Sequence, residues 1–354
     1  MQYQYQNPQQ YNQNQYPQGG WQQPPYGYYA PDPRFEEIRR ERKRISLISG
    51  LCAAAILAFL GLSLLLSGIL KVSLPSFEQL ILNDSLFNEA LNMVSSAVLI
   101  FVPFLIAYLI LRKKNSAGEL ILGTPYDKKN FWLLIPIAIM VCIAGSIATS
   151  YFSEFFLWLF GVEFEMPEDV SDYGSVSGVL ISLLSTAVIP AFVEEFAIRG
   201  VVMQSLRRYG DWFAIIMSSL VFALMHGNMI QIPFAFIAGI GIGYAVIKTG
   251  TMWTGIIIHF INNSVAVFSM VAYNGLSETG FSVFTGILYA VVFLIGTVCL
   301  IAFSKRNPRM LELSKGECRC LTTGNKTSRF IINPVMIVAI IILCIETSMF
   351  ISKS

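Results

Sequence analysis

The chain has 354 residues and a net charge of +2; 55% of its residues are hydrophobic and only 13% are charged. Soluble domains contain about 25% charged residues, so this composition excludes an ordinary soluble globular protein. Apolar stretches of roughly 20 residues, long enough to cross a bilayer as helices, recur along the sequence. So small a net charge gives no argument for a nucleic-acid partner. We therefore expect an all-α, polytopic membrane helix bundle of about 8–9 transmembrane helices in a lipid bilayer.

The first segment, residues 1–34, is rich in Gln, Tyr and Pro and carries no charge over its first 30 residues. It has too few aliphatic side chains to form a core, so we expect a disordered tail. No basic stretch followed by an apolar run marks a cleaved signal peptide. Residues 35–45 form a basic juxtamembrane segment with five Lys and Arg residues. These charges favour a cytoplasmic N-terminus.

Apolar stretches follow at 46–70, 92–111, 131–153, 177–206, 212–227, 229–247, 251–273, 281–304 and 330–351. We expect the membrane bundle over 46–304, a basic cytoplasmic loop over 305–329, and a last transmembrane helix over 330–351. Glu346 interrupts the outer end of this last stretch.

Charged residues alternate between the loops that join these stretches. Lys and Arg concentrate in every second loop, whereas the loops between them are acidic, the first through Glu78, Asp84 and Glu89. The basic asymmetry predicts an integral, multi-pass membrane protein with its N-terminus in the cytoplasm and its C-terminus outside.

Ionisable side chains also occur inside the apolar stretches. Both histidines, His226 and His259, lie there, as do Glu194 and Glu195. An acidic side chain at mid-membrane costs about 2.5–3.5 kcal/mol on insertion scales, so a cluster indicates a function. Two glutamates and two histidines could activate water and stabilise an oxyanion.

The two glutamates differ in their helical neighbours. Glu195 and Arg199 are spaced i,i+4 with the acid first, the favourable order for a helical ion pair. Glu194 is turned by about 100° around the helix and has no such partner. Burial without a partner favours its neutral form and suits it to act as a general base. A helix end with charges reaching the interface, or a structural pair between helices, would explain the same residues.

The histidine stretches carry further polar side chains. Phe222 lies one turn before His226, and His259 shares a face with Asn263 at i,i+4. A single histidine on an apolar helix is more often a core residue than a catalyst. A His/Asn pair on one face could donate two hydrogen bonds to one oxygen, or hold helices together.

Depth in the membrane favours a common site. At 1.5 Å per residue, Glu194 lies about 20 Å, His226 about 21 Å and His259 about 15 Å from the cytoplasmic end. Unrelated side chains reaching for the interface would not be expected at similar levels.

Three segments, EEFAIRG (194–200), FALMH (222–226) and HFINN (259–263), resemble the EExxxR, FxxxH and HxxxN motifs of the CPBP family, the CAAX-type prenyl proteases and bacteriocin-processing proteins. The resemblance covers a core of about 175–272. It implies an α-helical membrane fold of eight helices with a site open to the cytoplasm.

The resemblance also implies a glutamate-dependent endopeptidase without a cofactor. Glu194 and His226 would activate water, and His259 and Asn263 would form the oxyanion hole. The remaining motif residues, Glu195, Arg199 and Phe222, would support the site. Its partner would be a peptide or membrane-protein substrate, lipid-modified or membrane-associated, entering from the cytoplasmic side or the bilayer.

Two other functions remain open. Glu194, His226 and His259 are a workable catalytic zinc set, although no HExxH pair is present and the ligands would come from three helices. A non-catalytic scaffold or immunity protein of the same fold would bind a membrane partner, but would not need all six motif positions.

Overall fold

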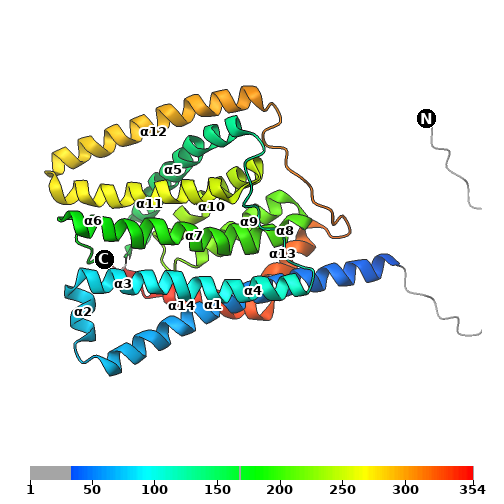
Figure 1. Ribbon diagram of the computed structural model, residues 1–354, viewed down its shortest axis with the longest axis horizontal. Coiled ribbons are helices and arrows are strands. Elements are labelled where there is room, and N and C mark those ends of the chain that lie inside the picture. The colour runs from blue at the N-terminus through cyan, green and yellow to red at the C-terminus, as the bar shows by residue number, and fades with distance from the viewer. Residues whose placement is uncertain (1–32, 167–168, 354) are drawn as a thin grey trace, which may run out of the picture.

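The computed structural model describes residues 33–166 and 169–353. The predicted disordered tail lies almost entirely outside the described residues. Within them, helices that run side by side along the long axis make up nearly all the regular structure, which confirms the all-α fold (Figure 1). The α-helices are α1 Pro33–Ser73, α2 Phe77–Asn83, α3 Ser85–Val94, α4 Phe101–Lys113, α5 Lys128–Phe160, α6 Val176–Ser182, α7 Ile189–Glu195, α8 Gln204–Leu206, α9 Asp211–Leu224, α10 Gln231–Thr249, α11 Met252–Gly275, α12 Glu278–Arg306, α13 Thr323–Ile331 and α14 Pro334–Ser348.

Shorter elements complete the described part of the chain. Three are π-helical segments that continue α-helices: η1 Ser95–Ile100, η2 Leu183–Val188 and η3 Phe196–Met203. One is a 3-10 turn, η4 Arg207–Tyr209. Two short strands, β1 Val162–Phe164 and β2 Ile351–Lys353, pair antiparallel with Val162 opposite Lys353.

The described helices include seven that are long and apolar enough to cross a membrane, or eight if a bent pair counts as one span. The bent pair is α13 with α14, which meet at 65°. Helix α14 lies within the predicted last span 330–351, whereas α13 lies almost entirely in the stretch 305–329 that was predicted as a loop. The predicted span at 212–227 is the 14-residue helix α9, shorter than a full crossing. The basic segment 35–45 is not a separate element, because it forms the beginning of α1.

Polar residues fix where these apolar helices begin. Without a partner, the first backbone N–H groups of a helix are unsatisfied, and an N-cap side chain accepts hydrogen bonds from them. Helices α5, α6, α11, α12 and α14 begin after such residues: Asp127, Ser175, Thr251, Ser277 and Asn333. Asp127 also pairs with Arg306 at 2.6 Å, and this hydrogen bond lowers the pKa of its carboxyl.

The bundle is built from neighbours that are distant in sequence. The packing order runs from α14 and α1, through α4 and the helix of α7, to α11 with α9 and α10, and then to α5 and α12 (Figure 1). The buried core contains mainly Ile and Ala side chains, with Phe, Val and Leu in smaller numbers. Many side chains of α12 and of the C-terminal part of α1 are exposed apolar groups, as expected for helices that face lipid.

The structure gathers the predicted cytoplasmic loops at one end. There Lys248 Nζ donates to the Glu312 carbonyl at 3.0 Å, and Arg44 donates to the Asn115 carbonyl at 2.5 Å. The strands β1 and β2 lie at the other end, where the C-terminus is marked, and β1 packs against α5 (Figure 1). Residues 114 and 174 therefore lie at opposite ends of the bundle.

One acidic residue differs from its predicted place. Glu89 was expected in an outer loop, but it lies in α3 and is only 3% exposed. Helix α3 continues through η1 into α4 as one span, Ser85–Lys113. The short polar stretch that looks like a loop in the sequence is therefore the outer part of a transmembrane helix.

The positive charge at one end predicts the orientation in the membrane. In a cysteine-free background, Gly174→Cys should react with a membrane-impermeant maleimide added to intact cells, whereas Lys114→Cys should react only after permeabilisation. Both positions are exposed in the structure, so accessibility of the side chain does not decide the result. If Lys114→Cys were labelled in intact cells and Gly174→Cys were not, the protein would have the opposite orientation in the membrane.

Candidate functional site

The helix that carries the two glutamates contains two π-helical segments. The α-helix α7 ends at Glu195 and is flanked by the π-helical segments η2 and η3. Single π-helical turns within α-helices occur frequently at functional sites. Here they bracket Glu194 and Glu195 and place Arg199 within η3.

Glu195 is the centre of a buried polar network. Its side chain is 0% exposed, and its Oε1 accepts a hydrogen bond from Arg199 Nη1 at 2.8 Å. This confirms the ion pair predicted from the i,i+4 spacing. The same Oε1 lies 3.0 Å from His259 Nδ1, a contact that the sequence did not predict. Arg199 Nη2 also donates to the Gly239 carbonyl at 3.3 Å, so the network joins three helices.

Gly255 makes room for the Glu195 carboxylate. A Cβ built on Gly255 would lie 2.5 Å from Glu195 Oε2, too close for any side chain. Gly255 precedes His259 by one helical turn, so both face Glu195 from α11. The sequence analysis did not identify this residue, although its i,i+4 spacing from His259 was visible.

Glu194 has a different environment from its neighbour. Its Oε2 lies 3.8 Å from His259 Nε2, and its side chain is 19% exposed. Within the described part of the chain, no donor forms a hydrogen bond to its carboxylate. His259 thus lies between two different glutamates. Glu195 is engaged through Oε1, whereas its buried Oε2 has no hydrogen-bond partner among the described residues, and Glu194 is partly exposed.

His226 is held through one ring nitrogen. Its Nδ1 lies 2.8 Å from the Phe222 carbonyl, which can only accept, so Nδ1 carries the proton and Nε2 has a free lone pair in the neutral ring. The Phe222 ring lies 4.8 Å from the His226 ring, 5.9 Å from the His259 ring and 4.7 Å from the Arg199 guanidinium carbon. The Phe222 ring therefore packs against three polar side chains of the site, those of His226, His259 and Arg199.

Asn263 lies one turn beyond His259 on α11. Its Nδ2 donates to the Thr186 carbonyl at 2.8 Å, and its Oδ1 accepts from Asn262 Nδ2 at 3.1 Å. A carboxamide has two N–H hydrogens, so one Nδ2 hydrogen remains available. No hydrogen bond joins Asn263 to His259 in the described structure.

The comparisons with known proteins concern this same part of the chain. Residues 176–265 match the family model described as type II CAAX prenyl endopeptidase Rce1-like. The matched segment includes all three predicted motifs, 194–200, 222–226 and 259–263. This agrees with the resemblance to CPBP proteins and supports an intramembrane CAAX-type protease. Comparison with curated proteins and with solved structures gave no match.

The histidines and carboxylates of the matched segment do not form a preformed metal site in the described part of the chain. Within the described residues, no three His, Cys, Asp or Glu side chains lie where they could hold a metal ion. Of the three alternative zinc ligands, Glu194 and His259 are close to each other, whereas the Nδ1 atoms of both histidines have hydrogen-bond partners within the protein.

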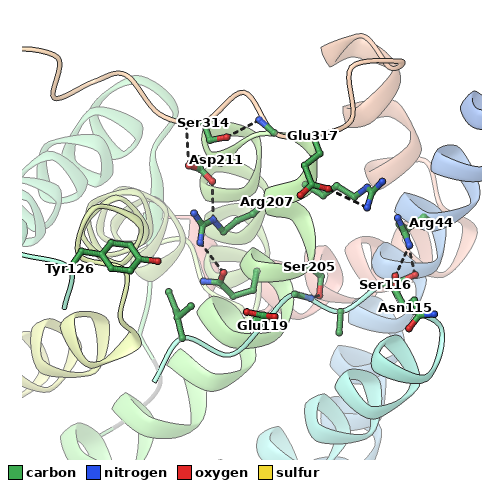
Figure 2. A pocket seen from close by; sticks show the side chains of 16 residues that line it. Arg44, Asn115, Ser116, Glu119, Tyr126, Ser205, Arg207, Asp211, Ser314 and Glu317 are labelled. Atoms are coloured by element: carbon green, nitrogen blue, oxygen red, sulfur yellow. Dashed lines mark hydrogen bonds and ion pairs between the residues drawn. The ribbon is translucent and has the colours of Figure 1, made fainter. Parts of the chain in front are cut away.

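A cavity of about 440 Å³ opens at the basic end of the bundle (Figure 2). Its wall includes Gln204, Arg207 and Asp211, and Arg207 bridges the other two through bonds of 3.2 and 2.9 Å. None of the predicted catalytic residues lines it. The cavity is therefore distinct from the polar network, which lies deeper along the same helix.

Proposed function

We propose that this protein is an intramembrane endopeptidase that hydrolyses peptide bonds of membrane-associated or lipid-modified substrates. The observation that supports this most is the contrast between two adjacent glutamates. Glu195 is buried and engaged by Arg199 and His259, whereas Glu194 is partly open and accepts no hydrogen bond within the described residues. A carboxylate without a donor, beside a buried and paired one, suits a general base.

In the proposed first step, Glu194 and His226 activate a water molecule. Glu194 accepts a proton from the water, and the lone pair on His226 Nε2 orients it by accepting a hydrogen bond. The water oxygen attacks the scissile carbonyl carbon and forms a tetrahedral oxyanion. When the carbon–nitrogen bond breaks, Glu194 returns its proton to the leaving amine.

His259 and Asn263 are the proposed oxyanion donors. This role requires His259 as the imidazolium, which has a proton on each ring nitrogen. An imidazolium held by Glu195 through Nδ1 donates from Nε2. Asn263 would offer the Nδ2 hydrogen that Thr186 does not use. Both donors are held in advance, which is the condition for strong stabilisation of a developing charge.

Removing one oxyanion donor should lower turnover with little effect on substrate binding. We expect Asn263→Ala to reduce kcat by about 10²–10³-fold, with KM nearly unchanged. Ser264→Ala is the matched control, because Ser264 lies next on α11 and donates only to the Phe260 carbonyl. Steady-state kinetics of both variants measure the difference, and equal kcat values would contradict the oxyanion role.

The proposed activity is tested with the purified protein in lipid nanodiscs. Peptides with and without a prenyl group on cysteine are incubated with the protein, and mass spectrometry locates the cleaved bond. Cleavage by the wild type is expected, and a preference for the prenylated peptide would indicate a CAAX-type substrate. Binding of these peptides without any cleavage would instead favour the non-catalytic scaffold.

A further inference from the structure

A second buried carboxylate lies outside the predicted site. Glu89 of α3 accepts hydrogen bonds at Oε1 from Ser171 and Ser182, each at 2.6 Å, and at Oε2 from Ser185. Each carboxylate oxygen can accept two hydrogen bonds, so three hydroxyls satisfy a group that would otherwise be costly to bury. Helices α3 and α6 lie side by side at the end of the bundle that holds the C-terminus (Figure 1).

The three serines differ in what they hold. Ser171 belongs to the loop before α6, whereas Ser182 ends α6 and Ser185 lies in η2. Glu89 therefore fixes the point at which the glutamate-bearing helix changes from α to π winding. Ser185 also lies beside Thr186, with their hydroxyl oxygens 3.5 Å apart.

Thr186 connects this cluster to the site. Its carbonyl accepts the hydrogen bond from Asn263 Nδ2 at 2.8 Å. One residue thus separates a serine bound by Glu89 from the acceptor that orients the Asn263 carboxamide. A shift of η2 would move the Thr186 carbonyl and redirect the remaining Nδ2 hydrogen of Asn263.

We propose that Glu89 is a positioning residue: by anchoring η2 through Ser185, it fixes the Thr186 carbonyl and so aims Asn263 at the reacting carbonyl group. The inference rests on the proposed function, because it assumes that Asn263 acts as an oxyanion donor. Glu89 itself does not touch the substrate. It lies outside the 176–265 segment that matches the family model.

Kinetics of three Glu89-related variants test the proposal. Glu89→Leu removes every acceptor and should lower kcat by roughly 10–100-fold with KM nearly unchanged, as expected for a misplaced catalytic group. Glu89→Gln keeps the shape and one acceptor oxygen and should recover most of the loss. Asp84→Ala is the control, because Asp84 caps the same helix through Phe87 N at 3.0 Å but does not contact η2. It should leave kcat within about twofold.

The serines offer a second comparison. Ser171→Ala and Ser185→Ala each remove one donor to Glu89, but only Ser185 belongs to η2. Ser185→Ala should therefore lower kcat more than Ser171→Ala does. Equal effects would indicate that Glu89 stabilises the outer end of the bundle in general, and would overturn the positioning role.

A double-mutant cycle separates positioning from general stability. In an Asn263→Ala background, Glu89→Leu should lower kcat by less than about twofold, because the residue that it positions is already absent. The same fold reduction in both backgrounds would overturn the proposal while leaving the proposed function intact. An Asn263→Ala variant with wild-type kcat would instead contradict the proposed oxyanion function.

Hydrogen–deuterium exchange tests the anchoring without activity. Peptides covering 183–188 should exchange faster in Glu89→Leu than in the wild type or in Asp84→Ala. Unchanged exchange across this segment would show that Glu89 does not hold η2 and would overturn the proposal.

Discussion

Glu194→Gln is expected to lower kcat by about 10²–10⁴-fold, the contribution of a general base, while the protein folds normally. Glutamine has the size of glutamate but cannot accept the proton from water. Because no hydrogen bond from the described residues engages the Glu194 carboxylate, the substitution breaks no hydrogen bond there, and its nearest charged neighbour is His259 Nε2 at 3.8 Å. Initial rates of peptide cleavage and the thermal midpoint of unfolding, measured on the same preparation, test both parts.

Two results for Glu194→Gln would contradict this prediction. A Glu194→Gln variant that retains wild-type kcat would show that another group takes the proton. A variant that loses activity and stability together would show that Glu194 has a structural role.

Glu195→Gln should instead destabilise the protein by about 3–5 kcal/mol, because it leaves the Arg199 charge buried without a counterion. The Arg199 side chain is 1% exposed, so solvent cannot replace the lost partner. Activity should fall as well, since His259 loses the carboxylate that holds its Nδ1. Thermal unfolding of the variant in detergent, beside Glu194→Gln as the matched control at the neighbouring position, measures the difference.

A paired substitution separates charge from packing. Glu195→Gln combined with Arg199→Gln removes both charges and should be more stable than Glu195→Gln alone. If the double variant loses as much stability as the sum of the two single variants, the buried ion pair does not explain the effect.

Much of this fold could be predicted because its determinants are local. The length of the apolar stretches predicted the long helices, and the i,i+4 spacing predicted the ion pair between Glu195 and Arg199. Similar depths along three helices predicted that Glu194, His226 and His259 lie at one level; the structure places Glu194 Oε2 3.8 Å from His259 Nε2 and shows no hydrogen bond from His226 to Glu194 within the described residues. The structure places Glu195 against His259 and the Phe222 ring against both histidines.

The features that could not be predicted from the sequence depend on contacts between helices or on changes from α- to π-helical winding. The periodicity of a single helix cannot show that His259 of α11 contacts Glu195 of α7. Nor can it show that Gly255 must leave space for the Glu195 carboxylate. The π-helical turns add no sequence signal of their own. The prediction that Glu89 lies in a loop was wrong because an acidic residue in a short polar stretch is typical of a loop. Its three serine partners, which satisfy its carboxylate inside the bundle, are not visible in the sequence.

Direct activation of water by Glu194 and His226 is tested most directly by the rate of peptide cleavage before and after exhaustive chelation, with zinc measured in the same sample. The account predicts an unchanged rate and no stoichiometric zinc. One zinc per chain, lost together with activity on chelation and restored with it when zinc is added, would contradict the account and favour Glu194, His226 and His259 as metal ligands.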